Sequence, residues 1–330
     1  MRIAALYRWL RWLFPVIALV VGLAIFRDEL PFLGEAWATL RHAAPLPVFA
    51  AVASAVASIL AMAAAMQLLM NVQGRIAGIG RCASITLASN AWSTTVPGGP
   101  AISAWLTYRV HRAWGASTGL CSWFFVISGA LSTIWLVLIG IAAVVLLDAS
   151  LSVGALLGSL GIALAFAAVL FWAANNPSLL RRGVQLLPGR VAALARRFID
   201  QIASIRMGAA TFALTAAFSL ANRLLDAASF FFATWAVAGD ASVRSVALAF
   251  VLIKLASAAQ VTPGGVGTVE AVAVGALVAS GFTLGDATAA TLIYRLISFA
   301  LITAVGWVIY FTRYAGRGYM LGYSPDTIAG

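Results

Sequence analysis

The feature that most constrains this chain is a series of apolar runs without charge, several of them longer than roughly 18 residues. A run of that length is typical of a transmembrane helix, because about 20 residues rising 1.5 Å each cross the hydrocarbon core. The chain is 63% hydrophobic and 9% charged, whereas soluble domains are about 45–50% apolar and about 25% charged. We therefore predict an all-α polytopic membrane protein.

Six apolar segments are predicted to span the membrane. They cover residues 12–26, 48–70, 118–147, 153–174, 208–238 and 287–311. Two further apolar stretches, 82–110 and 245–280, are each broken in the middle by proline and glycine. Because each half is shorter than the hydrocarbon core is thick, we predict two re-entrant broken hairpins. Their tips contain Pro97, Gly98 and Gly99 in the first and Pro263, Gly264, Gly265 and Gly267 in the second.

An inverted repeat is predicted from the two breaks. An offset of 166 residues (263 − 97) places one Pro-Gly-Gly on the other and superimposes the flanking apolar segments. Inverted repeats with discontinuous helices are typical of alternating-access transporters, and the alternative is a repeat kept only as a folding solution. The single membrane domain, 1–330, then divides into a first repeat at about 46–147, a linker helix and basic loop at 148–207, a second repeat at about 208–312 and a tail at 313–330.

The distribution of arginine predicts the orientation. With a cytoplasmic N-terminus and re-entrant hairpins, only Arg27, Arg41 and Arg244 of the loop arginines lie outside, in agreement with the positive-inside rule. We expect a multi-pass protein of the cell (inner, cytoplasmic) membrane with both termini in the cytoplasm. Two full crossings in place of each hairpin would give the same loop sides. The net charge of +11 is explained by these loops, so no nucleic-acid partner is expected. Residues 190–205 of the basic loop are predicted to form an amphipathic surface helix.

Five charged residues fall inside apolar segments, where a lone charge costs about 2.5–3.5 kcal/mol. They are Arg223, Asp226, Lys254, Glu270 and Arg295. Arg223 and Asp226 are three residues apart and can pair within one helix, which leaves one net positive charge on the other three. Together with free N–H groups of a helix that begins near Gly265, this charge predicts a site for an anionic group such as a lipid phosphate. The alternative is a buried ion network with only a structural role.

The first repeat offers neutral polar groups at the matching depth, and Asn90 is the one we include in the candidate site. His111 is predicted to lie at the membrane interface, and Cys82 and Cys121 are predicted to be inert apolar residues. No acidic pair or cysteine–histidine cluster has the spacing of a metal site, and no nucleotide-binding loop occurs in the sequence. We therefore expect no catalytic residues, no metal and no cofactor.

The segment Thr262-Pro263-Gly264-Gly265-Val266-Gly267-Thr268-Val269-Glu270, followed by Gly281 and then Tyr294-Arg295, resembles the flippase-like membrane domain of lysylphosphatidylglycerol synthases. Asn90, Pro97, Gly99 and Gly115 fit the looser first-half pattern of that family, and the resemblance covers roughly 37–311. In bifunctional members the resemblance implies a membrane flippase attached to a soluble aminoacyl-transferase domain. Because this sequence ends soon after residue 311, we expect a stand-alone member without synthase activity.

The function expected from these features is that of a flippase or translocase, which moves an anionic-headgroup lipid, such as a membrane phospholipid, between leaflets. Two alternatives stay open. One is a membrane anchor or partner that holds a separate soluble lipid-modifying enzyme through the basic loop, and the other is an integral-membrane lipid transferase. The small residues on the helix faces also permit a homodimer.

Overall fold

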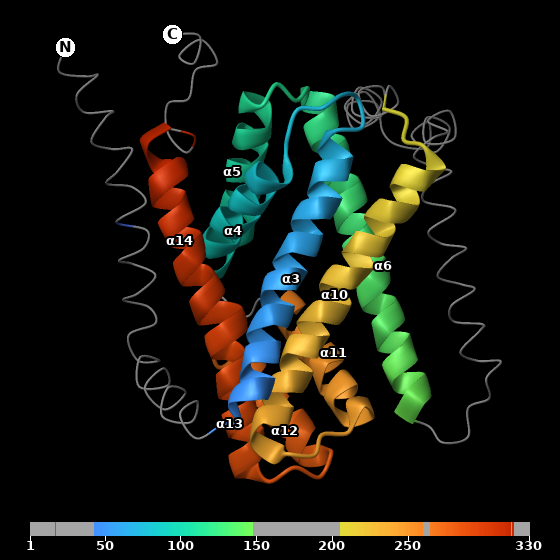
Figure 1. Ribbon diagram of the computed structural model, residues 1–330, viewed down its shortest axis with the longest axis vertical. Helices are drawn as coiled ribbons and strands as arrows, with labels where there is room; N and C mark the ends of the chain where they lie inside the picture. The colour runs from blue at the N-terminus through green and yellow to red at the C-terminus, as the bar shows by residue number, and fades with distance from the viewer. Residues whose placement is uncertain (1–16, 18–42, 148–204, 260–264, 318, 320–330) are drawn as a thin grey trace, which may run out of the picture. The chain divides into compact units, whose positions relative to one another are not determined.

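A computed structural model describes residues 17, 43–147, 205–259, 265–317 and 319 of the chain. Throughout these ranges the regular structure is helical and no strand occurs, which confirms the prediction of an all-α membrane protein. The helices are α3 (Pro45–Met70), α4 (Ile79–Thr95), α5 (Gly99–Ala113), α6 (Thr118–Leu147), α10 (Ala209–Ala238), α11 (Val243–Ala259), α12 (Thr268–Ala279), α13 (Leu284–Arg295) and α14 (Ile302–Arg313), shown in Figure 1. A π-helical turn, η3 (Leu296–Leu301), joins α13 to α14, and a 3-10 turn, η4 (Ala315–Arg317), follows.

Three helices in the described ranges are long and apolar enough to cross a membrane: Pro45–Met70, Thr118–Trp135 and Leu284–Arg317. They correspond to the segments predicted at 48–70, 118–147 and 287–311. The segment predicted at 208–238 is α10, which has 30 residues but carries charged residues in its middle. The segment predicted at 12–26 apart from residue 17, the segment predicted at 153–174, the surface helix predicted at 190–205 apart from residue 205, and the tip residues Pro263 and Gly264 lie outside the described residues.

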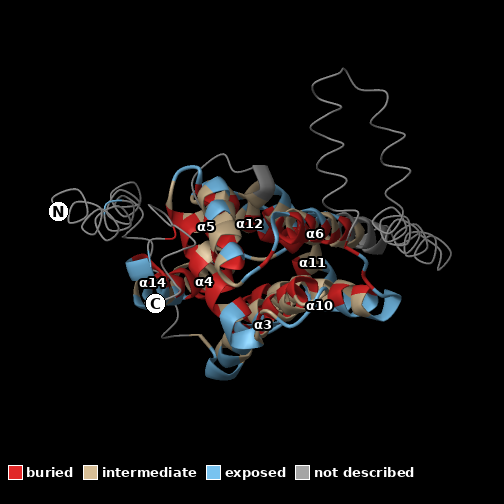
Figure 2. Cartoon of the chain, turned by 90° about the horizontal axis from the view of Figure 1, so that it is seen from above, coloured by how far each residue is buried: buried red, intermediate tan, exposed pale blue. Residues whose placement is uncertain are grey.

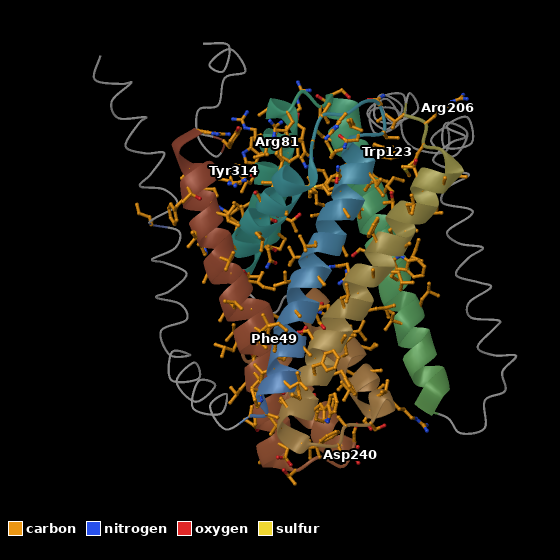
Figure 3. All side chains as sticks on the ribbon, viewed as in Figure 1. Phe49, Arg81, Trp123, Arg206, Asp240 and Tyr314 are labelled. Carbon is orange, nitrogen blue, oxygen red and sulfur yellow. The ribbon has the colours of Figure 1, made fainter. Side chains whose placement is uncertain are left out.

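Apolar side chains on α3 point outward in a stripe. Leu46, Phe49 and Val56 are 78%, 71% and 50% exposed, and their spacing puts them on one helical face. Figure 3 labels Phe49, and Figure 2 shows exposed residues along α3. Ala51 and Ala55 on the other face are buried. A helix with an apolar outer face and an alanine-rich inner face is suited to contact lipid on one side and pack closely on the other.

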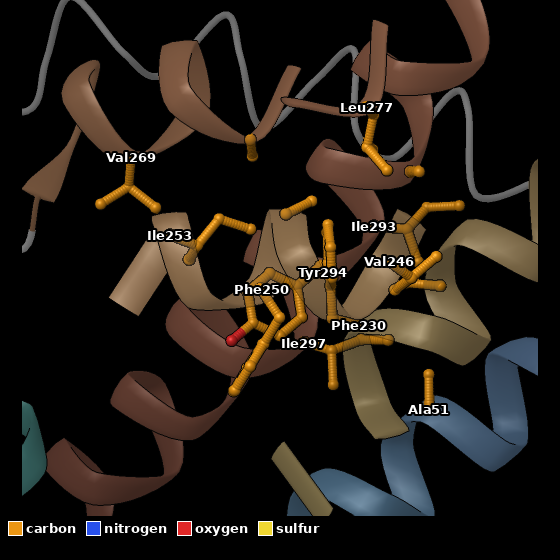
Figure 4. Packing of buried hydrophobic residues seen from close by; sticks show 14 of the residues in the cluster. Ala51, Phe230, Val246, Phe250, Ile253, Val269, Leu277, Ile293, Tyr294 and Ile297 are labelled. Carbon is orange, nitrogen blue, oxygen red and sulfur yellow. The ribbon is translucent and has the colours of Figure 1, made fainter. Parts of the chain in front are cut away.

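The described residues form two compact units. Unit 1 contains the described residues up to 59, those from 83 to 110 and those from 224 onward, and unit 2 contains residues 60–82, 111–147 and 205–223. The main core of unit 1 joins α10, α11, α12 and α13 around large side chains such as Phe230, Phe250 and Ile293 (Figure 4). Alanines on these helices are fully buried at the same core, and their small size lets the backbones approach.

The first break in the chain is a tight turn between α4 and α5, over residues 96–98, and it contains Pro97. Gly98 has φ +69°, a left-handed conformation that glycine adopts at no steric cost. Gly99 lies directly against the carbonyl oxygen of Trp92, so a Cβ there would overlap the backbone. The two helices have 17 and 15 residues, about 25 Å and 22 Å at 1.5 Å per residue. Each is therefore shorter than a hydrocarbon core of about 30 Å.

Helix α14 packs on α4 through one glycine and a cluster of aromatic and hydroxyl side chains. Gly306 lies directly against the carbonyl oxygen of Leu87, and a Cβ added to it would come 2.9 Å from the Ala91 Cβ. The rings of Trp92 and Trp307 lie 5.1 Å apart. Trp307 Nε1 donates to Thr95 Oγ1 over 3.2 Å, and the hydroxyls of Thr94 and Thr303 lie 3.1 Å apart. These contacts hold the first broken hairpin against the helix that continues from the candidate site.

Helix α13 begins at a side-chain cap. The Oγ1 of Thr283 accepts a hydrogen bond from the backbone N–H of Asp286 over 3.1 Å. Replacing Thr283 with alanine is expected to lower the free energy of unfolding by about 1 kcal/mol, because that N–H loses its acceptor. Thr288→Ala on the same helix is the control, since Thr288 is partly exposed and its hydroxyl donates to the carbonyl of Leu284 one turn before it. Equal thermal shifts for both variants would show that the cap contributes nothing.

Candidate functional site

Asp226, Lys254 and Tyr294 form a closed polar triad within unit 1. Lys254 Nζ lies 2.5 Å from Asp226 Oδ2 and donates to the Tyr294 hydroxyl over 3.2 Å. The same hydroxyl donates to Asp226 Oδ1 over 2.9 Å. The three residues come from α10, α11 and α13, which the apolar core brings together. Both carboxylate oxygens and the phenol oxygen therefore have partners within the triad.

Apolar and aromatic side chains surround the triad. The Tyr294 ring meets the Phe230 ring edge to face at 5.0 Å, and Lys254 Nζ lies 5.0 Å from the centre of the Phe250 ring. Figure 4 shows Tyr294 among Phe230, Phe250 and Ile297. The Asp226 and Lys254 side chains are 20% and 18% exposed. A charge in such surroundings is held by its partner and not by bulk water.

Glu270 and Arg295 form a second ion pair, between α12 and α13. Glu270 Oε1 lies 2.5 Å from Arg295 Nε, and the two side chains are 15% and 8% exposed. The guanidinium carbon of Arg295 lies 4.4 Å from the centre of the Phe299 ring, in the range of a cation–π contact. Glu270 Oε2 is buried and has no hydrogen-bond partner among the described residues. One oxygen of this carboxylate is thus ready to accept a proton donor.

Arg295 lies where the helix changes its winding. It is the last residue of α13 and caps the π-helical turn η3. Such turns are rare and frequently occur at functional sites, because the wider turn re-aims side chains and leaves backbone groups loosely paired. The ring that stacks on Arg295 belongs to Phe299 in the same turn. A change in η3 would therefore move Arg295 and its aromatic contact together.

The charges pair differently from the expected arrangement. Asp226 pairs with Lys254 and Tyr294, whereas we expected Arg223 as its partner. Together the two ion pairs of unit 1 are formally neutral, because two carboxylates face one ammonium and one guanidinium. Glu270 also lies in the first turn of α12, so a side chain of this protein already occupies the positive end of that helix dipole. The expectation of one unbalanced positive charge on Lys254, Glu270 and Arg295 was wrong, because the carboxylate of Asp226 balances it.

The other predicted residues lie elsewhere. Arg223 donates to the hydroxyl of Ser132 on α6, within unit 2. Asn90 is half-buried on α4, and no hydrogen bond or ion pair joins it to either pair in the part of the chain that the structure describes. Gly265 and Gly267, with φ of +69° and +81°, form the described end of the second tip, just before α12. Tyr294 was missing from our predicted site, although the Tyr-Arg pair was part of the motif that we compared.

His111 is buried, contrary to the expectation of an interfacial residue. It is 0% exposed, its ring lies 4.9 Å from Phe124 and 5.1 Å from Trp114, and neither ring nitrogen has a hydrogen-bond partner among the described residues. The sequence places it beside Arg109 and Arg112, which made an interfacial position plausible. The structure instead turns it into the interior of unit 2, while Cys82 and Cys121 are buried free thiols.

Comparison with known proteins gives one match over most of the chain. The family model described as Lysylphosphatidylglycerol synthase TM region matches residues 10–306. A search of curated proteins finds no match. The matched region contains both ion pairs, Tyr294 and both broken segments.

Proposed function

Because this chain belongs to the Lysylphosphatidylglycerol synthase TM region family, which is associated with membrane lipid metabolism, we propose that it moves an anionic-headgroup lipid between the leaflets of the membrane. The observation that carries this proposal is the pair of ion pairs, Asp226–Lys254 and Glu270–Arg295, held between otherwise apolar helices. Charges in membrane helices are costly, and they mark substrate pathways more often than they serve packing. The same proposal places the protein in the cell membrane with both termini in the cytoplasm, and it includes the inverted repeat predicted from the sequence.

A headgroup phosphate can bind at these pairs by replacing a carboxylate as the partner of the cation. Arg295 presents a planar fork that binds phosphate in the same way as it binds a carboxylate, so phosphate can replace Glu270 on it. Lys254 offers a second cation for the same group. The open oxygen of Glu270 then accepts a hydroxyl or amine proton from the headgroup. In this scheme the carboxylates hold the cations in the empty site and yield them to the lipid.

The second tip supports this scheme. Gly265 and Gly267 have backbone conformations that other residues rarely adopt, and Glu270 follows them at the start of α12. Glycines beside a charged helix start allow the backbone to shift without steric cost. A small backbone movement at Gly265 and Gly267 would therefore open or close the Glu270–Arg295 pair.

The test is lipid movement in liposomes that contain the purified protein and a headgroup-labelled phosphatidylglycerol. Arg295→Ala and Lys254→Ala are each expected to slow movement about 10- to 100-fold, because a hydrogen bond to a charged group is worth about 1.5–3 kcal/mol. Arg295→Lys keeps the charge but loses the fork, so an intermediate rate is expected. Arg244→Ala is the matched control, since Arg244 is an exposed cation on the same helix as Lys254.

Unchanged rates in both Arg295→Ala and Lys254→Ala, with folding verified by size-exclusion chromatography and circular dichroism, would reject the proposal. Absence of movement in the wild-type protein, together with capture of a soluble enzyme through residues 181–206, would favour the membrane-anchor alternative instead. Formation of a modified lipid from an activated donor by the pure protein would favour the transferase alternative.

A further inference from the structure

The two ion pairs of unit 1 differ in one chemical respect. Arginine keeps its proton under all conditions that proteins meet, whereas a buried lysine and a carboxylate can both change protonation state. The Glu270–Arg295 pair therefore always retains a cation. In the Asp226–Lys254 pair, transfer of one proton from the ammonium to the carboxylate makes both groups neutral, and uptake or loss of one proton changes the net charge of the pair. The two pairs thus differ in the chemistry of their cations.

Resting on the proposed lipid movement, we propose that the Asp226–Lys254–Tyr294 triad is a proton-exchange site that couples transfer of one proton to transfer of one anionic lipid. The Glu270–Arg295 pair binds the headgroup without exchanging protons. The class of co-substrate is thus the hydrogen ion, and its binding group is the carboxylate of Asp226.

The triad has the geometry for this exchange. The Tyr294 hydroxyl accepts from Lys254 and donates to Asp226, so it links the two titratable groups through one oxygen. The Asp226 and Lys254 side chains are 20% and 18% exposed, whereas Tyr294 is 3% exposed. The phenol is therefore held in place by the core, while the carboxylate keeps part of its surface exposed.

The surrounding helices add few other charges. On α12 and α13 the groups are Glu270 and Arg295, which pair with each other, and Asp286, which is partly exposed and accepts a hydrogen bond from the Thr283 hydroxyl. Helix α11 carries Arg244 in its exposed first turn. Helix α3, whose Ala51 and Ala55 line the same core, has no ionisable residue along Pro45–Met70. On α10 the further charge is Arg223, which donates to Ser132.

The charge balance requires a proton. When the single negative charge of a phosphodiester replaces Asp226 on Lys254, the freed carboxylate would add an unpaired negative charge in apolar surroundings, which is costly. A proton from water that binds the Asp226 oxygen forms an O–H bond and removes that charge. When the lipid leaves on the other side, the O–H bond breaks, the proton leaves with the lipid, and Asp226 pairs with Lys254 again. No bond of the lipid changes in this cycle.

The first measurement uses liposomes filled with a pH-sensitive dye and carrying labelled phosphatidylglycerol. Wild-type protein is expected to transfer one proton per lipid, and an imposed pH gradient is expected to change the rate with the sign of the gradient. Asp226→Asn is expected to abolish proton transfer and gradient dependence, and Tyr294→Phe to reduce both. Arg295→Lys, which alters only the headgroup pair, is expected to remain coupled, and Asp240→Asn is the matched control because Asp240 is exposed (Figure 3).

The second measurement does not depend on transport. Calorimetric titration of the protein in detergent with dihexanoylphosphatidylglycerol, in two buffers of different ionisation enthalpy, counts the protons taken up on binding. One proton per lipid is expected for the wild type and for Asp240→Asn, and none for Asp226→Asn. If the Asp226 variant does not fold, the number of protons that the wild-type protein takes up per lipid is the test of the proposal.

The possible failures are distinguishable. Lipid movement without proton transfer or uptake would overturn the coupling and leave the proposed function intact. Proton uptake on lipid binding without movement between leaflets would support the triad as the proton site but reject translocation. If the protein neither binds nor moves the lipid, both the proton coupling and the proposed function are overturned.

Discussion

Replacing Glu270 with alanine is expected to lower the free energy of unfolding by about 3–5 kcal/mol, because it removes the carboxylate that pairs with a buried guanidinium. Glu270 Oε1 lies 2.5 Å from Arg295 Nε, and Arg295 is 8% exposed. The loss should exceed that of Asp226→Ala, since Lys254 can release its proton and become neutral, whereas Arg295 cannot. Denaturant unfolding in detergent, followed by circular dichroism, measures both.

Two further variants separate the effect of charge from that of packing. Glu270→Ala combined with Arg295→Met removes both charges of this pair and should recover most of the loss, because neither member is left as a buried charge. Asp240→Ala removes an exposed acid between α10 and α11 and should change stability by less than about 0.5 kcal/mol. A double variant no more stable than Glu270→Ala would contradict the assignment of the loss to an unpaired charge.

Gly306→Ala is expected to destabilise the protein by about 1–3 kcal/mol, because the added methyl group overpacks the crossing of α4 and α14. At this position a Cβ would overlap the carbonyl oxygen of Leu87 and lie 2.9 Å from the Ala91 Cβ. A backbone carbonyl cannot turn away as a flexible side chain can, so the helices must separate. The separation should also weaken the contact between Trp92 and Trp307, which tryptophan fluorescence can report.

The matched control is Gly275→Ala on α12. No atom lies within 4 Å of a Cβ added to Gly275, and alanine is favoured over glycine inside a helix by about 1 kcal/mol. This variant should therefore be neutral or slightly stabilising. Equal losses at Gly306 and Gly275 would show that α4 and α14 do not rely on the close approach at Gly306.

Helix positions followed closely from the sequence. The predicted segment 118–147 coincides with α6 (Thr118–Leu147), and the segment 208–238 begins one residue before α10. The broken segment 82–110 is two helices joined at residues 96–98, as Pro97 and the following glycines indicate. Such features are local, because hydropathy, helix propensity and the stereochemistry of proline and glycine act over a few neighbouring residues.

The candidate site followed only in part. The cost of charge inside apolar segments singled out five candidates, Arg223, Asp226, Lys254, Glu270 and Arg295, and four of these form the two ion pairs of unit 1. The partner of each charged residue could not be predicted in the same way. Spacing within one helix favoured Arg223 as the partner of Asp226, whereas the packing of α10, α11 and α13 places Lys254 and Tyr294 beside it. The burial of His111 was missed for the same reason, since the neighbouring arginines gave no sign that the side chain turns inward.

The sequence by itself determined that this is an all-α membrane protein, where its helices break and which side chains carry charge at depth, since all of these depend on the transfer of single residues and short segments from water. Only the tertiary structure decided how those charges neutralise one another and that a phenol bridges one pair. Pairing depends on distances of a few ångströms between helices far apart in the chain, and these are set by the close packing of alanine and glycine faces.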